Sequence, residues 1–100
     1  MTLDDILRDI HALEEDLLVF ERKYGVLSDT FYQAYQRGEE PPNESWVLDW
    51  SEWGATYELF QERRKRYGEA IEQLMTSHAD LSLSQLIEQT ARRESPAVAA

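Results

Sequence analysis

The stretch SWVLDWSEWGATYELFQERRKRYGEAIEQLMTSH, residues 45–78, decides the fold. Counted in sevens, it repeats mostly apolar residues at two positions. The first position holds Trp46, Trp53, Phe60, Tyr67 and Leu74, and the second holds Trp50, Tyr57, Arg64, Ile71 and His78. A repeat of this kind without an internal proline predicts one helix of about 33 residues, roughly 50 Å long. Such a helix needs something to cover its aromatic seam.

Residues 2–24 predict a second long helix. Thr2 and Asp5 have the spacing of a capping box, and Gly25 suits the left-handed position that ends a helix. Apolar residues recur along it at spacings of three and four: Leu3, Ile6, Ile10, Leu13, Leu17, Phe20, Tyr24 and Leu27, with Leu7 and Leu18 widening the stripe. This stripe is typical of a helix in a bundle.

Two shorter helices complete the prediction. Ser28-Asp29 is an N-cap signal, and Gly38 ends a helix of about nine residues. Pro41-Pro42 marks the next residues as a loop, after which Asn43 or Ser45 caps the long helix. Asp80 and Ser82 are both candidate caps for a short helix ending near 90–91, and Ser82 with Gln85 fits a capping box. Residues 92–100 read as a frayed tail.

The expected fold class is therefore all-α. Because the linkers are short, the two long helices should form an antiparallel hairpin or bundle with the short connecting helix wedged at one end. We expect a helical hairpin domain over residues 1–79 and a short helix with a flexible tail over 80–100.

Charge indicates the kind of partner. The 100 residues include 20 acidic and 10 basic ones, for a net charge of −10. That balance argues against binding to a phosphate backbone, so nucleic acid is an unlikely partner and a basic protein is favoured. The sequence has no cysteine, no signal-peptide pattern and no apolar run of the ~20 residues that a membrane span needs, so we expect a cytoplasmic protein.

No pattern points to catalysis, so we expect a non-enzymatic protein without metal or cofactor. His11 and His78 lie far apart, with no metal-ligand spacing around either. The glycines are scattered and form no phosphate-binding loop.

The most distinctive feature is an acidic, tryptophan-bearing interval. No Lys or Arg occurs between Arg37 and Arg63, whereas seven acidic residues and all three tryptophans fall there. Tryptophan is enriched at binding hot spots, and carboxylates steer basic partners. The expected partner-binding residues are Glu39, Glu40, Trp46, Asp49, Trp50, Glu52 and Trp53. The alternative is that the rings are core, packed on Leu17 and Phe20.

The basic cluster 63–66 reads as a solvated helix surface with acidic partners one turn away. Arg64 is the exception, because it occupies a seam position. A cation there either reaches solvent or pairs across the helices, with Glu14 or Asp16 as the candidate partner.

Three strings carry a resemblance that covers roughly residues 13–74: Phe20-Glu21-x-Lys23-Tyr24-Gly25-x-x-Ser28-x-x-Phe31, then Gly38-Glu39-Glu40, then Asp49-Trp50-x-Glu52-Trp53 with Tyr57 downstream. They resemble small, acidic, all-helical prokaryotic proteins of the antitoxin-like type found beside small toxins in toxin–antitoxin pairs. The resemblance implies a non-enzymatic protein that neutralises a basic, RNA-acting toxin, with Glu39, Glu40, Asp49, Glu52 and the nearby tryptophans as contacts.

Two alternatives to this antitoxin-like reading stay open. The long seam also suits a coiled-coil-type homo-oligomer, such as a homodimer, in which two copies cover each other. The string over residues 82–88 is similar to the closing helix of ribbon-helix-helix repressors, which would suit a transcriptional autoregulator. The strand and first helix of that fold are missing, so this reading ranks last.

Overall fold

The computed structural model describes residues 1–77 and 81–91, and all regular structure in that part of the chain is helical. The elements are α1 (Leu3–Tyr24), α2 (Ser28–Gln36), a 3-10 turn η1 (Glu44–Trp46), α3 (Val47–Ser77) and α4 (Leu83–Thr90). The all-α class is confirmed. The expected end of the long helix at His78, the candidate cap Asp80 and the expected frayed tail over 92–100 lie outside the described residues.

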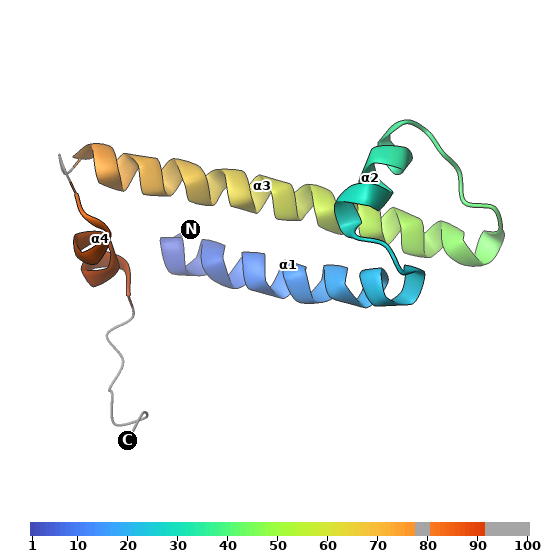
Figure 1. Ribbon diagram of the computed structural model, residues 1–100, viewed down its shortest axis with the longest axis horizontal. Coiled ribbons are helices and arrows are strands. Elements are labelled where there is room, and N and C mark those ends of the chain that lie inside the picture. The colour runs from blue at the N-terminus through green and yellow to red at the C-terminus, as the bar shows by residue number, and fades with distance from the viewer. Residues whose placement is uncertain (78–80, 92–100) are drawn as a thin grey trace, which may run out of the picture.

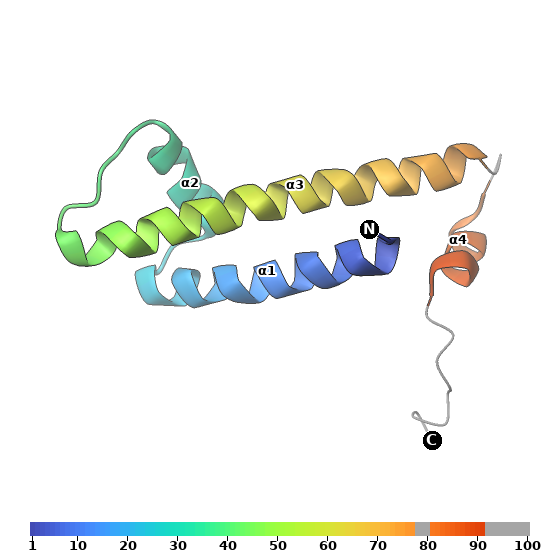
Figure 2. The same ribbon diagram turned by 180° about the vertical axis from the view of Figure 1, so that it is seen from behind.

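The two long helices, α1 and α3, lie side by side and run in opposite directions (Figures 1 and 2). Ion pairs join them at two well-separated levels. Arg63 of α3 pairs with Asp9 of α1 at 2.9 Å, and Lys23 near the end of α1 pairs with Asp49 near the start of α3 at 2.6 Å. The short helix α2 packs where α1 ends and α3 begins. None of the helices over residues 1–77 and 81–91 combines the length and the hydrophobicity that a membrane-spanning helix needs.

The helix ends follow local chemistry with two exceptions. The capping boxes at Thr2 and Ser82 are both present, and Gly25 has a φ of 76°, as the sequence predicts. Ser28 is not the N-cap of α2, because Leu27 occupies that position and Ser28 is already helical. The long helix begins at Val47 rather than Ser45, because residues 44–46 form a 3-10 turn.

The core is built around one ring. The side chain of Trp53 is 1% exposed and lies between aromatic rings of the two other helices. Phe31 of α2 stacks on it at a centroid distance of 3.9 Å with an interplanar angle of 3°, and Phe20 of α1 stacks at 5.6 Å. Removing a large aromatic side chain from such a site costs about 3–5 kcal/mol. Trp53 therefore fixes how the three helices meet.

The predicted apolar stripe of α1 is only partly buried. Ile6, Ile10 and Leu17 are buried, as a bundle helix requires. Leu18 and Leu27 are 41% and 64% exposed, so the prediction that they belong to the packed stripe is wrong. Both side chains line a depression beside α1 that is described below.

Candidate functional site

The residues expected to bind a partner do not form one surface. Trp53 is enclosed in the core, and its Nε1 donates a hydrogen bond of 2.9 Å to Ser28 Oγ. Its expected role as a direct partner contact is therefore wrong, because the folded chain hides the ring. The alternative, that the tryptophans are core, is correct for Trp53, whereas Trp46 and Trp50 are half-buried.

Asp49 is used within the chain. Its Oδ2 accepts hydrogen bonds of 2.6 Å from Lys23 Nζ and from the Tyr24 hydroxyl. These donors hold the pKa of the Asp49 carboxyl below its usual value, with Lys23 as the larger cause. Burial, and then the bond to Asp49, raise the pKa of the Tyr24 phenol to about 12. Asp49 therefore joins the start of α3 to the end of α1 through two hydrogen bonds.

Four of the expected residues, Glu39, Trp46, Trp50 and the buried Trp53, do come together. They line a cavity of about 260 Å³, which we call the aromatic hollow. Its remaining lining residues are Tyr24, Val26, Thr30, Phe31 and Ala34. Trp46 meets Tyr24 edge to face at a centroid distance of 5.3 Å and lies roughly parallel to Trp50 at 6.1 Å.

Glu40 and Glu52 lie outside the aromatic hollow. Glu52 borders a shallow depression on the α1–α3 surface with Asp16 and Phe20. Glu40 is exposed in the loop before η1. The acidic interval of the sequence is therefore distributed over several faces of the molecule.

Trp50, which lines the hollow, has a buried polar atom without a hydrogen-bond partner among the described residues. The atom is the enclosed Nε1 of its indole ring. An enclosed donor without an acceptor costs about 1–3 kcal/mol, and native proteins keep few of them.

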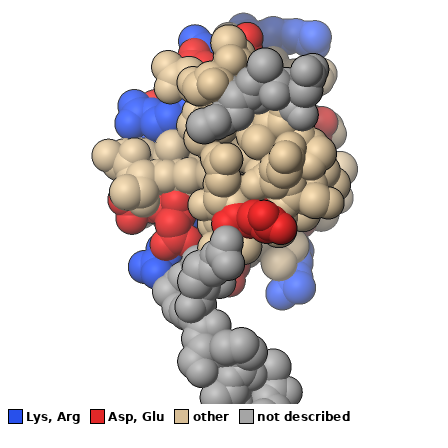
Figure 3. Space-filling model, turned by 90° about the vertical axis from the view of Figure 1, so that its left-hand side faces the viewer, with Lys and Arg blue, Asp and Glu red and all other residues tan. Residues whose placement is uncertain are grey.

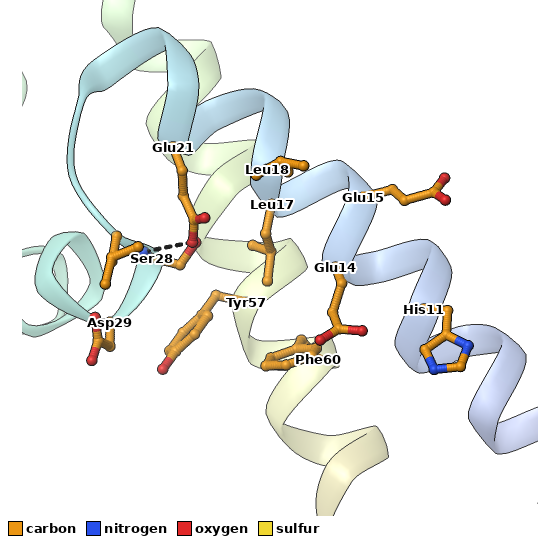
Figure 4. Close-up of a pocket in the computed structure, with 11 residues that line it drawn as sticks. His11, Glu14, Glu15, Leu17, Leu18, Glu21, Ser28, Asp29, Tyr57 and Phe60 are labelled. Carbon is orange, nitrogen blue, oxygen red and sulfur yellow. Dashed lines mark hydrogen bonds between the residues drawn. The ribbon is translucent and has the colours of Figure 1, made fainter.

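A larger depression lies on another side of α1, and we call it the acidic groove (Figure 4). It has a volume of about 600 Å³, and none of its eleven lining residues is Lys or Arg. Its apolar members are Leu17, Leu18, Leu27, Tyr57 and Phe60; its acidic members are Glu14, Glu15, Glu21 and Asp29; His11 and Ser28 complete it. Figure 4 shows α1 supplying most of the carboxylates, while Tyr57 and Phe60 come from α3.

The wall between α1 and α2 is held by Ser28, which is 3% exposed. Its backbone N–H and its hydroxyl both donate to Glu21 Oε2, at 2.9 and 2.7 Å, and its Oγ accepts from Trp53. This chain of hydrogen bonds joins all three helices and fixes one end of the groove (Figure 4).

The sequence did not identify this groove. Its residues come from three separated segments, and only the packing of α1, α2 and α3 brings them together. One signal was present in Leu18, whose position beside the stripe made the apolar face of α1 wider than a two-helix contact requires.

Within the basic cluster 63–66, Arg63 forms the ion pair with the facing helix. Of the two outcomes expected for Arg64, the structure shows the one in which it reaches solvent, and not a pairing with Glu14 or Asp16. Arg63 Nε donates to Asp9 at 2.9 Å and its guanidinium also meets Glu62. Arg64 is exposed and lies over the Phe60 ring, with its guanidinium carbon 5.7 Å from the ring centroid. Seam spacing is approximate, and one residue rotates a side chain by about 100°.

Over residues 1–77 and 81–91, no three His, Cys, Asp or Glu side chains are grouped so that they could hold a metal ion. Comparison with protein families, with curated proteins and with solved structures finds no match to the chain. The antitoxin-like resemblance therefore stays a prediction, and function has to be argued from the surfaces themselves.

Proposed function

We propose that this chain is a non-enzymatic protein-binding module, built on an antiparallel pair of long helices, that takes a basic partner in the acidic groove. One observation carries the proposal: a groove with five apolar side chains and four carboxylates has no Lys or Arg in its lining. A small basic toxin, the partner that the resemblance implies, belongs to the class of protein that such a groove would suit.

The chemistry of the groove selects an amphipathic helix as the contacting segment. Leu18, Leu27 and Phe60 offer apolar area to the buried face of such a helix, which is how helices bind in grooves. Glu14 and Asp29 lie in position to meet Lys or Arg on its flanks. Charge of this kind speeds association and rejects acidic competitors, while apolar burial supplies most of the affinity.

The test uses two synthetic peptides of about 14 residues with the same leucine pattern, one with lysine and one with glutamate at the polar positions. The lysine peptide should bind, and binding should weaken as salt rises because exposed charges are screened. Equal binding of the two peptides, or no binding of the lysine peptide, would refute the charge argument.

Two variants of α1 with the same change of charge test whether the peptide binds in the acidic groove. Glu14→Lys places a positive charge in the groove and should weaken binding of the lysine peptide by roughly tenfold, as losing about 1.4 kcal/mol implies. Asp16→Lys makes the same change of charge on α1 but faces the depression beside Glu52 instead. A similar loss in both variants would mean that net charge, and not the groove, attracts the peptide.

Homo-oligomerisation is a second candidate function, because apolar side chains are exposed at the end of the molecule that carries α4. Leu83 and Ile87 of α4 are 71% and 50% exposed, and Met75 near the end of α3 is also exposed. Viewed from that end, uncharged side chains cover much of the surface and most charged ones lie toward its edges (Figure 3). Light scattering at micromolar concentration should report a dimer if copies associate there, and a monomer would exclude this candidate.

A further inference from the structure

The aromatic hollow has a size and lining that suit a single small headgroup. Its volume of about 260 Å³ lies below the ~300–1,000 Å³ of pockets that hold drug-sized ligands. The half-buried rings of Trp46 and Trp50 line it with Tyr24, and Trp46 and Tyr24 are nearly perpendicular, at 78°. The hollow is therefore lined by aromatic rings in more than one orientation.

The charge around the hollow favours a cation. Glu39 belongs to its lining, and the sequence has no Lys or Arg from residue 38 to residue 62. Lys23 Nζ lies 5.6 Å from the centroid of the Tyr24 ring, but its charge is paired with Asp49 at 2.6 Å, and neither Lys23 nor Asp49 lines the hollow. Aromatic faces attract cations within about 6 Å through the ring quadrupole.

The scarcity of acceptors selects the kind of cation. Glu39 and Thr30 are the only lining residues with a carboxylate or an aliphatic hydroxyl. A lysine ammonium brings three N–H donors and a guanidinium brings five, and each donor loses free energy if it leaves water without an acceptor. A quaternary ammonium carries its charge without any N–H donor, so no unpaired donor costs it free energy when it leaves water.

We propose that the aromatic hollow is a binding site for a quaternary ammonium group, held against Trp46 and Trp50 with Glu39 as counter-charge. The group could be carried by a small molecule of the choline type or by a trimethylated lysine side chain. The site shares no lining residue with the acidic groove, so it adds a second ligand to the proposed function.

Choline chloride is the first probe, and its control is 3,3-dimethylbutan-1-ol, the neutral molecule of the same shape in which carbon replaces nitrogen. Cation–π attraction predicts that choline binds about 5–30-fold more tightly than the neutral alcohol. A second pair, N-acetyl trimethyllysine amide and N-acetyl lysine amide, distinguishes a modified side chain from a free small molecule. If choline binds more tightly than the trimethyllysine amide, the quaternary ammonium belongs to a small molecule. If the trimethyllysine amide binds more tightly, it belongs to a modified lysine side chain.

The indole N–H resonances of the three tryptophans give a site-resolved readout. Those of Trp46 and Trp50 should shift on titration, whereas that of Trp53, bonded to Ser28, should move least. If choline shifts none of them at about 50 mM, or if the neutral alcohol binds equally well, the proposal is overturned.

Adjacent glutamates supply the matched variants. Glu39→Gln should weaken choline binding about threefold by removing the counter-charge, and Glu40→Gln, at an exposed position outside the lining, should leave it unchanged. Equal effects of the two variants would assign the attraction to general charge and overturn the site. Glu14→Lys in the acidic groove should not alter choline binding, so the two proposals can fail separately.

Discussion

Two glycines in α3 allow a direct test of how closely α2 approaches it. Gly54 and Gly68 both lie inside this helix, where glycine is about 1 kcal/mol less favourable than alanine. A Cβ added at Gly54 would lie 2.5 Å from Cε2 and 2.9 Å from Cζ of Tyr35. A Cβ added at Gly68 would meet nothing within 4 Å. The same substitution should therefore have opposite effects at the two positions.

The magnitudes follow from two opposing contributions. Gly68→Ala should raise the free energy of unfolding by about 1 kcal/mol, the gain in helix propensity alone. Gly54→Ala has the same gain, but the Tyr35 ring must retreat by about 1 Å to reach ordinary contact distance. That ring stacks on Phe31 at a centroid distance of 5.2 Å, so moving it disturbs the core. Overpacking of this kind costs about 1–3 kcal/mol.

Urea denaturation followed by circular dichroism measures both variants. The gap between them should be about 1–3 kcal/mol, and each kcal/mol corresponds to about 4–8 °C in Tm for a chain of this size. In a Tyr35→Ala background the obstacle is absent, so Gly54→Ala should then stabilise the protein as Gly68→Ala does. Equal stabilisation of the unmodified protein by Gly54→Ala and Gly68→Ala would show that α2 does not pack on Gly54 in solution.

Three further predictions concern the contacts that join the helices. Ser28→Ala should lower the free energy of unfolding by about 1–3 kcal/mol, measured in urea, because the enclosed Nε1 of Trp53 loses its acceptor. Arg63→Ala should lower the unfolding midpoint more than Arg64→Ala, since only Arg63 pairs with the facing helix; equal midpoints would contradict this register. Asp49→Asn should destabilise the protein at neutral pH, and thermal melts should show the difference shrinking as pH falls below 3.8. The pKa of this carboxyl is lower in the folded than in the unfolded protein. Its contribution to the free energy of unfolding is therefore fully present above the unfolded value of 3.8 and is lost as the pH falls through the lower, folded value.

The helices themselves could be predicted because their signals are local. Gly25 ends α1 and Ser82 begins α4 where the sequence indicates, since a cap depends on neighbouring residues only. Ser28 shows the limit of this reasoning. Its hydroxyl fits an N-cap equally well, but a buried indole and a carboxylate seven residues earlier are stronger partners.

The candidate sites were less predictable. A cation-free interval in the sequence placed Glu39 and Trp50 near each other, and the structure does bring them to one hollow. The same reasoning failed for Trp53, because hydrophobicity does not reveal which ring of a series is enclosed. The acidic groove was not predicted, since Glu14 and Asp29 are close only after α1 and α2 have packed.

The sequence by itself determined that this protein is helical, where most of its helices end and which residues form the apolar seam, because backbone hydrogen bonds and side-chain periodicity act over a few residues. Tertiary structure alone decided that Arg63 pairs across the seam, that Trp53 is the enclosed ring and which carboxylates border a groove. These choices depend on the rotation of each helix about its own axis, and a change of one residue, about 100°, exchanges a buried side chain for an exposed one.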